Sequence, residues 1–163
     1  MDVKFSGDEI IEMAIQIEKK GAQFFDTIAH NSRHPKMKNI LQYLAEQERE
    51  HIKIFEKLRA KENIVQNSES VNNWEQISPY FQSLIETKVF PDSTEGEDLL
   101  KELQDEIGAI HIAISFEKDN ILFFQEIRNI VLEQEQKLLD QLILEEKDHI
   151  QKLVELKRSI IIK

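Results

Sequence analysis

The feature that most constrains this chain is a long-range internal repeat. Glu48 and His51 stand three residues apart. The same pair recurs 98 residues later as Glu146 and His149. A second motif, a Glu followed six and seven positions later by two Phe residues, begins at Glu18 and recurs 99 residues further on. Two motifs that recur at nearly the same distance indicate that the halves of the chain are copies of one structural unit.

Each half of the chain has the pattern of two long helices joined by a short turn. Only 4 Gly and 3 Pro occur among the 163 residues, so long uninterrupted helices are expected. Apolar residues recur at the spacing of amphipathic helices, which predicts helices at about 7–31, 35–62, 105–130 and 133–161. The predicted fold is all-α, a four-helix bundle of two antiparallel hairpins that forms a single domain over residues 1–163.

Residues 63–104 are predicted to form the crossover that connects the two hairpins. The segment begins with a polar stretch, and a connection of this length is unusual unless it crosses a bundle or covers a site. We expect it to contain short helices at about 74–89 and 95–103. Its aromatic residues are the expected anchors that seal one end of the core: Trp74, Tyr80, Phe81 and Phe90.

The hairpin turns place the repeated residues at the same height in the bundle. The midpoint between Glu18 and Glu48 falls in the turn before Pro35, a residue that suits the first position of a helix. The midpoint between Glu117 and Glu146 falls in the turn predicted between the last two helices. If the hairpins pack around a pseudo-two-fold axis, all four Glu side chains and both His side chains meet in the middle of the bundle.

Four carboxylates in a helical core are costly to bury without opposite charge. Two divalent cations balance their charge, so the sequence predicts a dinuclear metal site. The predicted roles are Glu18 and Glu117 as terminal ligands, Glu48 and Glu146 as bridges, and His51 and His149 as one ligand for each metal. Mixed oxygen and nitrogen ligation favours iron, with manganese as a substitute. Zinc would bind but would be redox-silent.

Composition disfavours several other sites and partners. The net charge of -10 disfavours nucleic acid and anionic membranes, and no apolar run approaches the ~20 residues of a membrane span. The lack of Cys excludes disulfides, thiolate nucleophiles and Cys-ligated iron–sulfur or rubredoxin sites. The first residues have no signal-peptide pattern, so a cytoplasmic location is expected. The remaining histidines lie near a turn or off the ligand face and are predicted not to be ligands: His30, His34 and His111.

With these residues in place, the chain resembles the ferritin-like di-iron carboxylate proteins, and among them the rubrerythrin-like branch. The resemblance covers essentially the whole chain. The residues that carry it are Glu18, Gln47-Glu48-x-x-His51, Glu117 and Glu145-Glu146-x-x-His149. It implies a ferritin-like bundle with two iron ions, which reduces peroxide or O2 through Fe(II)/Fe(III) cycling and often forms a homodimer.

The resemblance also implies a partner for each imidazole. In several members of the family, the residue just before each bridging Glu bonds the His of the opposite hairpin. Glu145 would then form a hydrogen bond with His51, and Gln47 would form one with His149. Such partners fix the tautomer and the orientation of a metal-binding imidazole.

The chain departs from the best-known members of the family in three respects. They carry a rubredoxin domain, and none is expected here, so a separate electron-transfer protein would supply the electrons. Asn120 stands where they have an additional Glu, which removes the basis for a ligand exchange at that position. Phe25 and Phe124 stand where Tyr is common, so no nearby tyrosyl radical is expected. These two Phe residues are expected to wall the site, to belong to the ordinary core, or both.

Two other functions fit the same six ligands. One is iron oxidation and storage in a ferritin-like or bacterioferritin-like assembly. Bacterioferritins place a haem-binding Met after the second-helix ligand, and Arg49 stands there in this chain. The long crossover also fits a dimer better than a cage. The other function is a non-catalytic metal-binding helical bundle, whose signature would be bound zinc without turnover.

Overall fold

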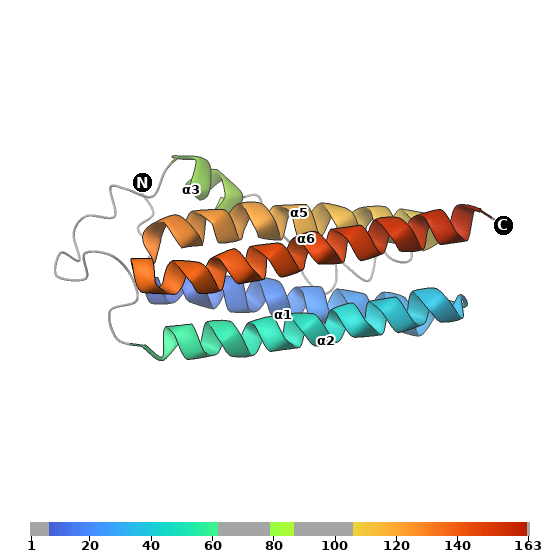
Figure 1. The fold of residues 1–163 in the computed structure, drawn as a ribbon, viewed down its shortest axis with the longest axis horizontal. Coiled ribbons are helices and arrows are strands. Elements are labelled where there is room, and N and C mark those ends of the chain that lie inside the picture. The colour runs from blue at the N-terminus through green and yellow to red at the C-terminus, as the bar shows by residue number, and fades with distance from the viewer. Residues whose placement is uncertain (1–6, 62–78, 87–105, 163) are drawn as a thin grey trace.

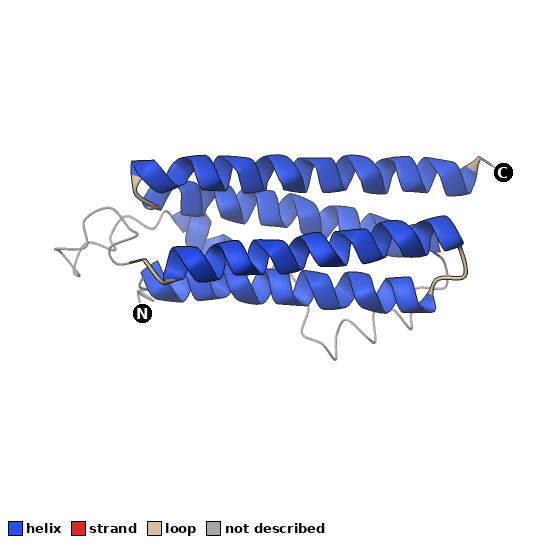
Figure 2. Ribbon diagram, turned by 60° about the horizontal axis from the view of Figure 1, so that its bottom comes forward, coloured by secondary structure: helices blue, strands red, loops and turns tan. Residues whose placement is uncertain are grey.

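The computed structural model describes residues 7–61, 79–86 and 106–162. The helices in these residues are α1 (Gly7–Asn31), α2 (Pro35–Arg59), α3 (Pro79–Glu86), α5 (Glu106–Ile130) and α6 (Glu133–Ile161). The first two long helices form one antiparallel hairpin, the last two form a second, and the hairpins lie side by side along their length (Figure 1). A second view shows the four long helices running nearly parallel to a common axis (Figure 2). The predicted all-α bundle of two hairpins is confirmed.

The predicted ends of the long helices agree with the structure to within one residue, except at the end of α2. This helix ends at Arg59 rather than at residue 62. Leu58 is its last buried residue. The backbone N–H of Ala60 donates to the carbonyl oxygen of Glu56, and that of Lys61 donates to the carbonyl oxygen of Leu58, which closes the last turn. The next three residues in the sequence are Ala60, Lys61 and Glu62, so one more helical turn would add little apolar surface to the core.

The two hairpin turns are short, and no side chain caps the helix that follows either of them. His34 has an extended backbone and Pro35 begins α2, as predicted from its fixed φ. The second turn consists of Val131 and Leu132, and Val131 is fully buried. Because both connections are so short, α1 must lie against α2 and α5 against α6, and these pairs do make the most extensive helix contacts.

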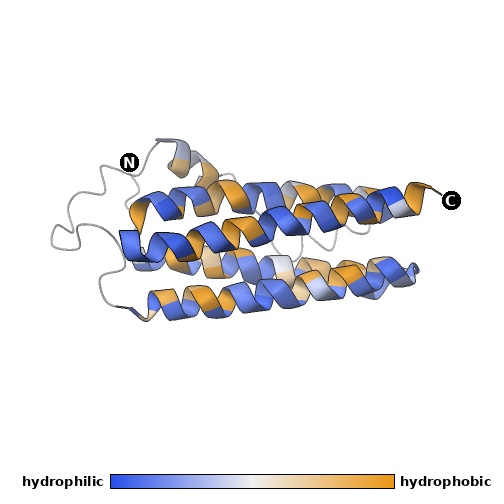
Figure 3. Cartoon of the chain, viewed as in Figure 1, coloured by the Kyte–Doolittle hydropathy of each residue, from blue (hydrophilic) through white to orange (hydrophobic). Residues whose placement is uncertain are grey.

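The bundle buries two hydrophobic clusters, one toward each end. The first cluster includes Ile10, Ile15, Phe55, Phe124 and Leu142. The second cluster includes Phe25, Leu44, Ala113, Leu153 and Leu156. Each long helix contributes to both clusters, and hydrophobic and hydrophilic residues alternate around every helix (Figure 3). None of the described helices combines the length and the apolar character that crossing a membrane requires.

Polar contacts join the two hairpins at both ends of the bundle. At the end with the α1–α2 turn, Ser32 Oγ donates to Glu106 Oε1 at 2.7 Å, and the backbone N–H of Arg33 donates to the same oxygen at 3.1 Å. At the other end, Lys61 Nζ donates to both carboxylate oxygens of Glu135, at 2.8 and 2.7 Å. These contacts help to keep the hairpins in register.

The helix α3 is the part of the predicted crossover that the structure describes. Phe81 is 1% exposed, and its ring centroid lies 5.3 Å from that of Phe123, so it anchors α3 to α5. Tyr80 is 49% exposed, and the prediction that it is an anchor is wrong. Adjacent helical residues point ~100° apart, so only one of the two faces the bundle. The other two predicted anchors, Trp74 and Phe90, and the predicted helix at 95–103 lie outside the described residues.

The orientation of α6 predicts that truncating two leucines that stand two residues apart changes the free energy of unfolding by different amounts. Leu142 is 0% exposed and Leu144 is 63% exposed. Leu142→Ala is expected to lower the free energy of unfolding by about 2–5 kcal/mol, because it leaves a cavity in the core. Leu144→Ala, the matched control, is expected to change it by less than about 0.5 kcal/mol. Urea unfolding followed by circular dichroism measures both, and equal losses would contradict this placement.

Candidate metal centre

A layer of buried acidic and imidazole side chains separates the two hydrophobic clusters. It consists of Glu18 from α1, Glu48 and His51 from α2, Glu117 from α5, and Glu146 and His149 from α6. Each of these side chains is no more than 1% exposed. On α2 and on α6 the Glu and the His are one helical turn apart, so both point into the bundle from the same face.

The six side chains form two groups of four that share two members. One group is Glu18, Glu48, His51 and Glu146, and the other is Glu48, Glu117, Glu146 and His149. In each group, one ligand atom per residue can be chosen so that all four atoms lie within 4.8 Å of one another. Glu48 and Glu146 belong to both groups, as residues that bridge two metal ions would. The structure therefore brings all six predicted ligands together in the predicted pattern.

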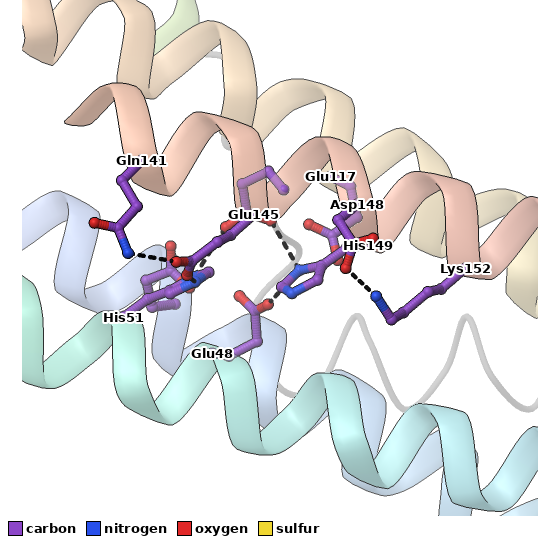
Figure 4. Close-up of polar contacts among 10 residues, drawn as sticks. Glu48, His51, Glu117, Gln141, Glu145, Asp148, His149 and Lys152 are labelled. Carbon is purple, nitrogen blue, oxygen red and sulfur yellow. Dashed lines mark hydrogen bonds and ion pairs between the residues drawn. The ribbon is translucent and has the colours of Figure 1, made fainter. Parts of the chain in front are cut away.

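Both imidazoles direct the same ring nitrogen into the layer. His51 Nδ1 lies 3.0 Å from Glu146 Oε1 and 3.4 Å from Glu18 Oε2. His149 Nδ1 lies 3.1 Å from Glu146 Oε2 and 3.3 Å from Glu48 Oε1. The ring planes differ by 17° and the centroids are 5.6 Å apart. Figure 4 shows the two rings reaching the layer from opposite hairpins.

Most polar atoms of the layer have no hydrogen-bond partner among the described residues. They are both carboxylate oxygens of Glu18, Glu48 and Glu117, Oε1 of Glu146 and Nδ1 of His51. The last two atoms are close to each other but are not aligned for a hydrogen bond. Leaving a buried polar group without a partner costs about 1–3 kcal/mol, and more for a charged group. The atoms without partners are oxygen and imidazole nitrogen donors that point at a common centre. Two divalent cations would satisfy them and balance the four carboxylates, so the residues fit a dinuclear centre.

The carboxylates of the metal-free layer do not share one ionisation state. Burial and the charge of Glu48 raise the pKa of Glu18 well above the usual carboxylate range. Burial and the charge of Glu146 do the same to the pKa of Glu117. Burial alone would also raise the pKa of Glu146. Its contacts with Glu117 and with the two imidazoles outweigh burial and lower that pKa. Without metal ions, the terminal carboxyl groups of Glu18 and Glu117 therefore favour the protonated form more than an exposed carboxyl would.

The imidazoles also hold protons more tightly than usual. Burial alone would lower the pKa of His51, but the adjacent Glu146 carboxylate and the charge of Glu48 raise it to about 9. Burial also opposes protonation of His149, and its contacts with Glu117, Glu146 and Glu48 outweigh it and raise its pKa. Metal ions bind the deprotonated forms of these ligands, so metal binding releases protons from the layer.

The other ring nitrogen of His51 is held from the opposite hairpin. His51 Nε2–H donates to Glu145 Oε2 at 2.9 Å, and Gln141 Nε2 donates to the second oxygen of Glu145 at 2.9 Å (Figure 4). A carboxylate that accepts the Nε2 proton leaves Nδ1 available for a metal ion. The contact between Glu145 and His51 is the one that the resemblance implied. Gln141 was missed in the sequence, although its position four residues before Glu145 on a helix would have indicated it.

Gln47 does not make the corresponding contact. Its side chain is half-buried, and within the described residues no hydrogen bond joins it to His149. Among the described residues, only His51 has an anionic partner on its outer ring nitrogen, so the two imidazoles are held differently.

The other predicted residues near the layer are also buried. Phe25 and Phe124 are both 0% exposed, in the second and first hydrophobic cluster respectively, and the Phe124 ring lies 5.1 Å from that of Phe55. Each is therefore a core residue two helical turns from a Glu of the layer. Asn120 is 0% exposed and lies one turn beyond Glu117 on α5.

The remaining histidines stay outside the layer, as their sequence positions predicted. His30 and His111 are exposed, and His34 is half-buried in the α1–α2 turn. Neither four-residue group contains any of them.

Comparisons with known proteins connect this geometry to a family. A sequence model of the rubrerythrin family matches residues 9–157. Among solved structures, the chain is similar to a proposed ferritin-like diiron-carboxylate protein from Thermotoga maritima, with 29% identity, a TM-score of 0.75, and 97% of this chain and 98% of that chain covered. It is also similar in fold to a hypothetical protein from Pyrococcus furiosus, with 22% identity, a TM-score of 0.65, and 96% and 91% covered. A comparison with curated proteins returned no match.

The bundle and its buried carboxylate–histidine layer define a ferritin-like protein of the diiron-carboxylate type. More particularly, the chain belongs to the rubrerythrin family, whose model covers most of its length. The resemblance seen in the sequence is thereby confirmed.

The raised pKa of His51 predicts a pH-dependent stability for the metal-free protein. Its pKa is 6.5 in an unfolded chain and about 9 in the folded one, so the stabilisation is complete below pH 6.5 and is lost as the pH rises to about 9. For this group alone the loss is about 3 kcal/mol. Glu18 and Glu117 act in the same direction, because their raised pKa values also favour the protonated form.

Urea unfolding of the metal-free protein at several pH values between 6 and 9 measures this effect. His51→Asn is expected to reduce the pH dependence, and His111→Asn, which changes an exposed histidine, is the control that should retain it. A metal-free protein whose stability is constant or rises over this range would contradict the ionisation states described here.

Proposed function

We propose that this protein is a non-haem di-iron oxidoreductase that reduces peroxide or O2 with electrons from an external donor. The observation that carries the proposal is that Glu48 and Glu146 belong to both four-residue groups. Two metal ions joined by shared carboxylates can act together in a two-electron step. Membership of the rubrerythrin family supports the same reading.

The set of donor atoms favours iron as the resident metal. Each group offers three carboxylates and one imidazole. Mixed oxygen and nitrogen donors suit iron, and manganese is the nearest substitute. Zinc accepts similar ligands but has no redox chemistry, so a zinc-loaded protein would be inactive in electron transfer.

The proposed reaction balances with two iron ions. Two bound Fe(II) ions would supply the two electrons that, with two protons, reduce hydrogen peroxide to two water molecules. These ions would be held by Glu18, Glu48, His51, Glu117, Glu146 and His149. The four carboxylates would balance the metal charge, and Glu145 accepts the Nε2 proton of His51 in a hydrogen bond. The hydrophobic clusters on either side limit the access of water.

The external donor and the homodimer are parts of the same proposal. The 163 residues include no Cys, so they hold no Cys-ligated redox centre that could pass electrons to the layer. A separate electron-transfer protein is the donor that we propose. A homodimer is what the family resemblance implies.

Anaerobic titration with Fe(II) tests the metal site. The protein is expected to bind two iron ions per chain. Glu48→Ala removes a residue shared by both groups and should lose both ions. Glu18→Ala removes a residue of only one group and should lose one. Glu50→Ala, an exposed neighbour on α2, is the control that should still bind two. Saturation of the unmodified protein below about one ion would refute the site.

Stopped-flow mixing of the Fe(II)-loaded protein with peroxide and with O2 tests the chemistry. Oxidation is expected to be faster with peroxide, and repeated turnover is expected when a reductant is supplied. Uptake of many iron ions per chain, together with a cage-sized particle in light scattering, would instead indicate iron storage. Two bound metal ions with no absorbance change on either oxidant would indicate a non-catalytic bundle.

A further inference from the structure

Asn120 is a buried amide beside the proposed metal centre, and it has no hydrogen-bond partner among the residues that the structure describes. Its side chain is 0% exposed, and both Oδ1 and Nδ2 lack such a partner. It is the one fully buried polar residue described there that is neither a carboxylate nor an imidazole. A buried amide is normally hydrogen-bonded, because leaving it without a partner is unfavourable. Its position therefore requires an explanation beyond packing.

The helices place Asn120 toward the His51 end of the layer. Three residues on a helix advance ~4.5 Å along the axis and keep nearly the same face, so Asn120 lies one turn beyond Glu117 on the inner side of α5. His51 likewise lies three residues beyond Glu48 on α2. Phe55 stands seven residues after Glu48 on α2, and Phe124 stands seven residues after Glu117 on α5. Because the rings of these two Phe residues are in contact, α2 and α5 run from the layer toward the same end of the bundle.

The opposite end of the layer has no equivalent of this amide. In the internal repeat, the counterpart of Asn120 is Gly21, three residues after Glu18. Gly21 is buried and contributes no side chain. His51 also has the carboxylate of Glu145 on its outer nitrogen, and His149 lacks such a partner within the described residues. The two metal positions are therefore built from matching ligands but have different neighbours.

We propose that the Asn120 side-chain amide binds a small exogenous ligand, an anion or an oxygen donor, at the His51 end of the dinuclear centre. This inference rests on the proposed function, since the ligand needs the metal ions. Carboxylates offer no hydrogen-bond donor, and the Nε2–H of His51 is already engaged by Glu145. The Nδ2 hydrogens of Asn120 are free to donate to such a ligand. The centre then binds the ligand preferentially at one of its two ends.

Azide titration of the Fe(III)-loaded protein, followed by its charge-transfer absorbance, tests this proposal. Asn120→Leu keeps the size of the side chain but removes the amide, and Asn120→Ala is a second variant that requires no space for repacking. Both are expected to bind two iron ions and to weaken azide binding by about tenfold or more, because a hydrogen bond to a charged ligand is lost. Gln125→Leu makes the same exchange of an amide on the exposed face of α5 and should not change azide affinity.

The possible failures are distinguishable. If the unmodified protein does not bind two iron ions, the proposed function fails, and this inference fails with it. If it binds two iron ions but no azide, or if both Asn120 variants bind azide as tightly as the unmodified protein does, only this inference is overturned. Loss of an iron ion from both variants also overturns it, because Asn120 would then be a metal ligand.

Discussion

The carboxylates of the buried layer repel one another, and the surrounding bundle holds them together. Four of them lie in the interior of the bundle, where charge is poorly screened, and two imidazoles lie among them. Burial and this repulsion raise the pKa values of Glu18 and Glu117, and two divalent cations would offset the repulsion. The layer also divides the apolar core into two clusters, so neither cluster alone spans the bundle. Contacts such as those of Glu106 with Ser32 and of Lys61 with Glu135 hold the hairpins together at the two ends.

Much of this arrangement could be predicted because it follows from spacing. Residues three apart on a helix lie on the same face. A short turn places residues equally far from it at the same height on the two helices of a hairpin. The repeat and the turns together therefore predicted that Glu18 and Glu117 lie in one layer. Features that depend on tertiary packing were less accessible. The end of α2 at Arg59 is set by where the core stops, and the exposure of Tyr80 depends on how α3 rotates against α5. The contact predicted for Gln47 is absent in the described residues, because side-chain hydrogen bonds depend on rotamers that spacing does not determine.

The two halves of the chain contribute matching ligands, but the residues around those ligands differ between the two ends of the layer. The repeated hairpin explains why the centre is nearly symmetric. Glu145 and Asn120 both distinguish the end that contains His51. Glu145 accepts a hydrogen bond from the imidazole, and Asn120 adds an amide that has no hydrogen-bond partner in the described part of the chain. Gly21 at the matching position leaves the other end without that amide. Two metal ions bound in this layer would therefore occupy inequivalent positions.

We propose that the buried layer holds two metal ions between the hairpins. Crystals grown anaerobically with Fe(II) and measured at the iron absorption edge would locate these ions through their anomalous scattering. Two peaks per chain are expected, about 3.5–4 Å apart as in other dinuclear sites. One peak should lie beside His51 and the other beside His149, with Glu48 and Glu146 near both. A single peak, or peaks that lie outside this layer, would show that the layer does not hold a dinuclear centre.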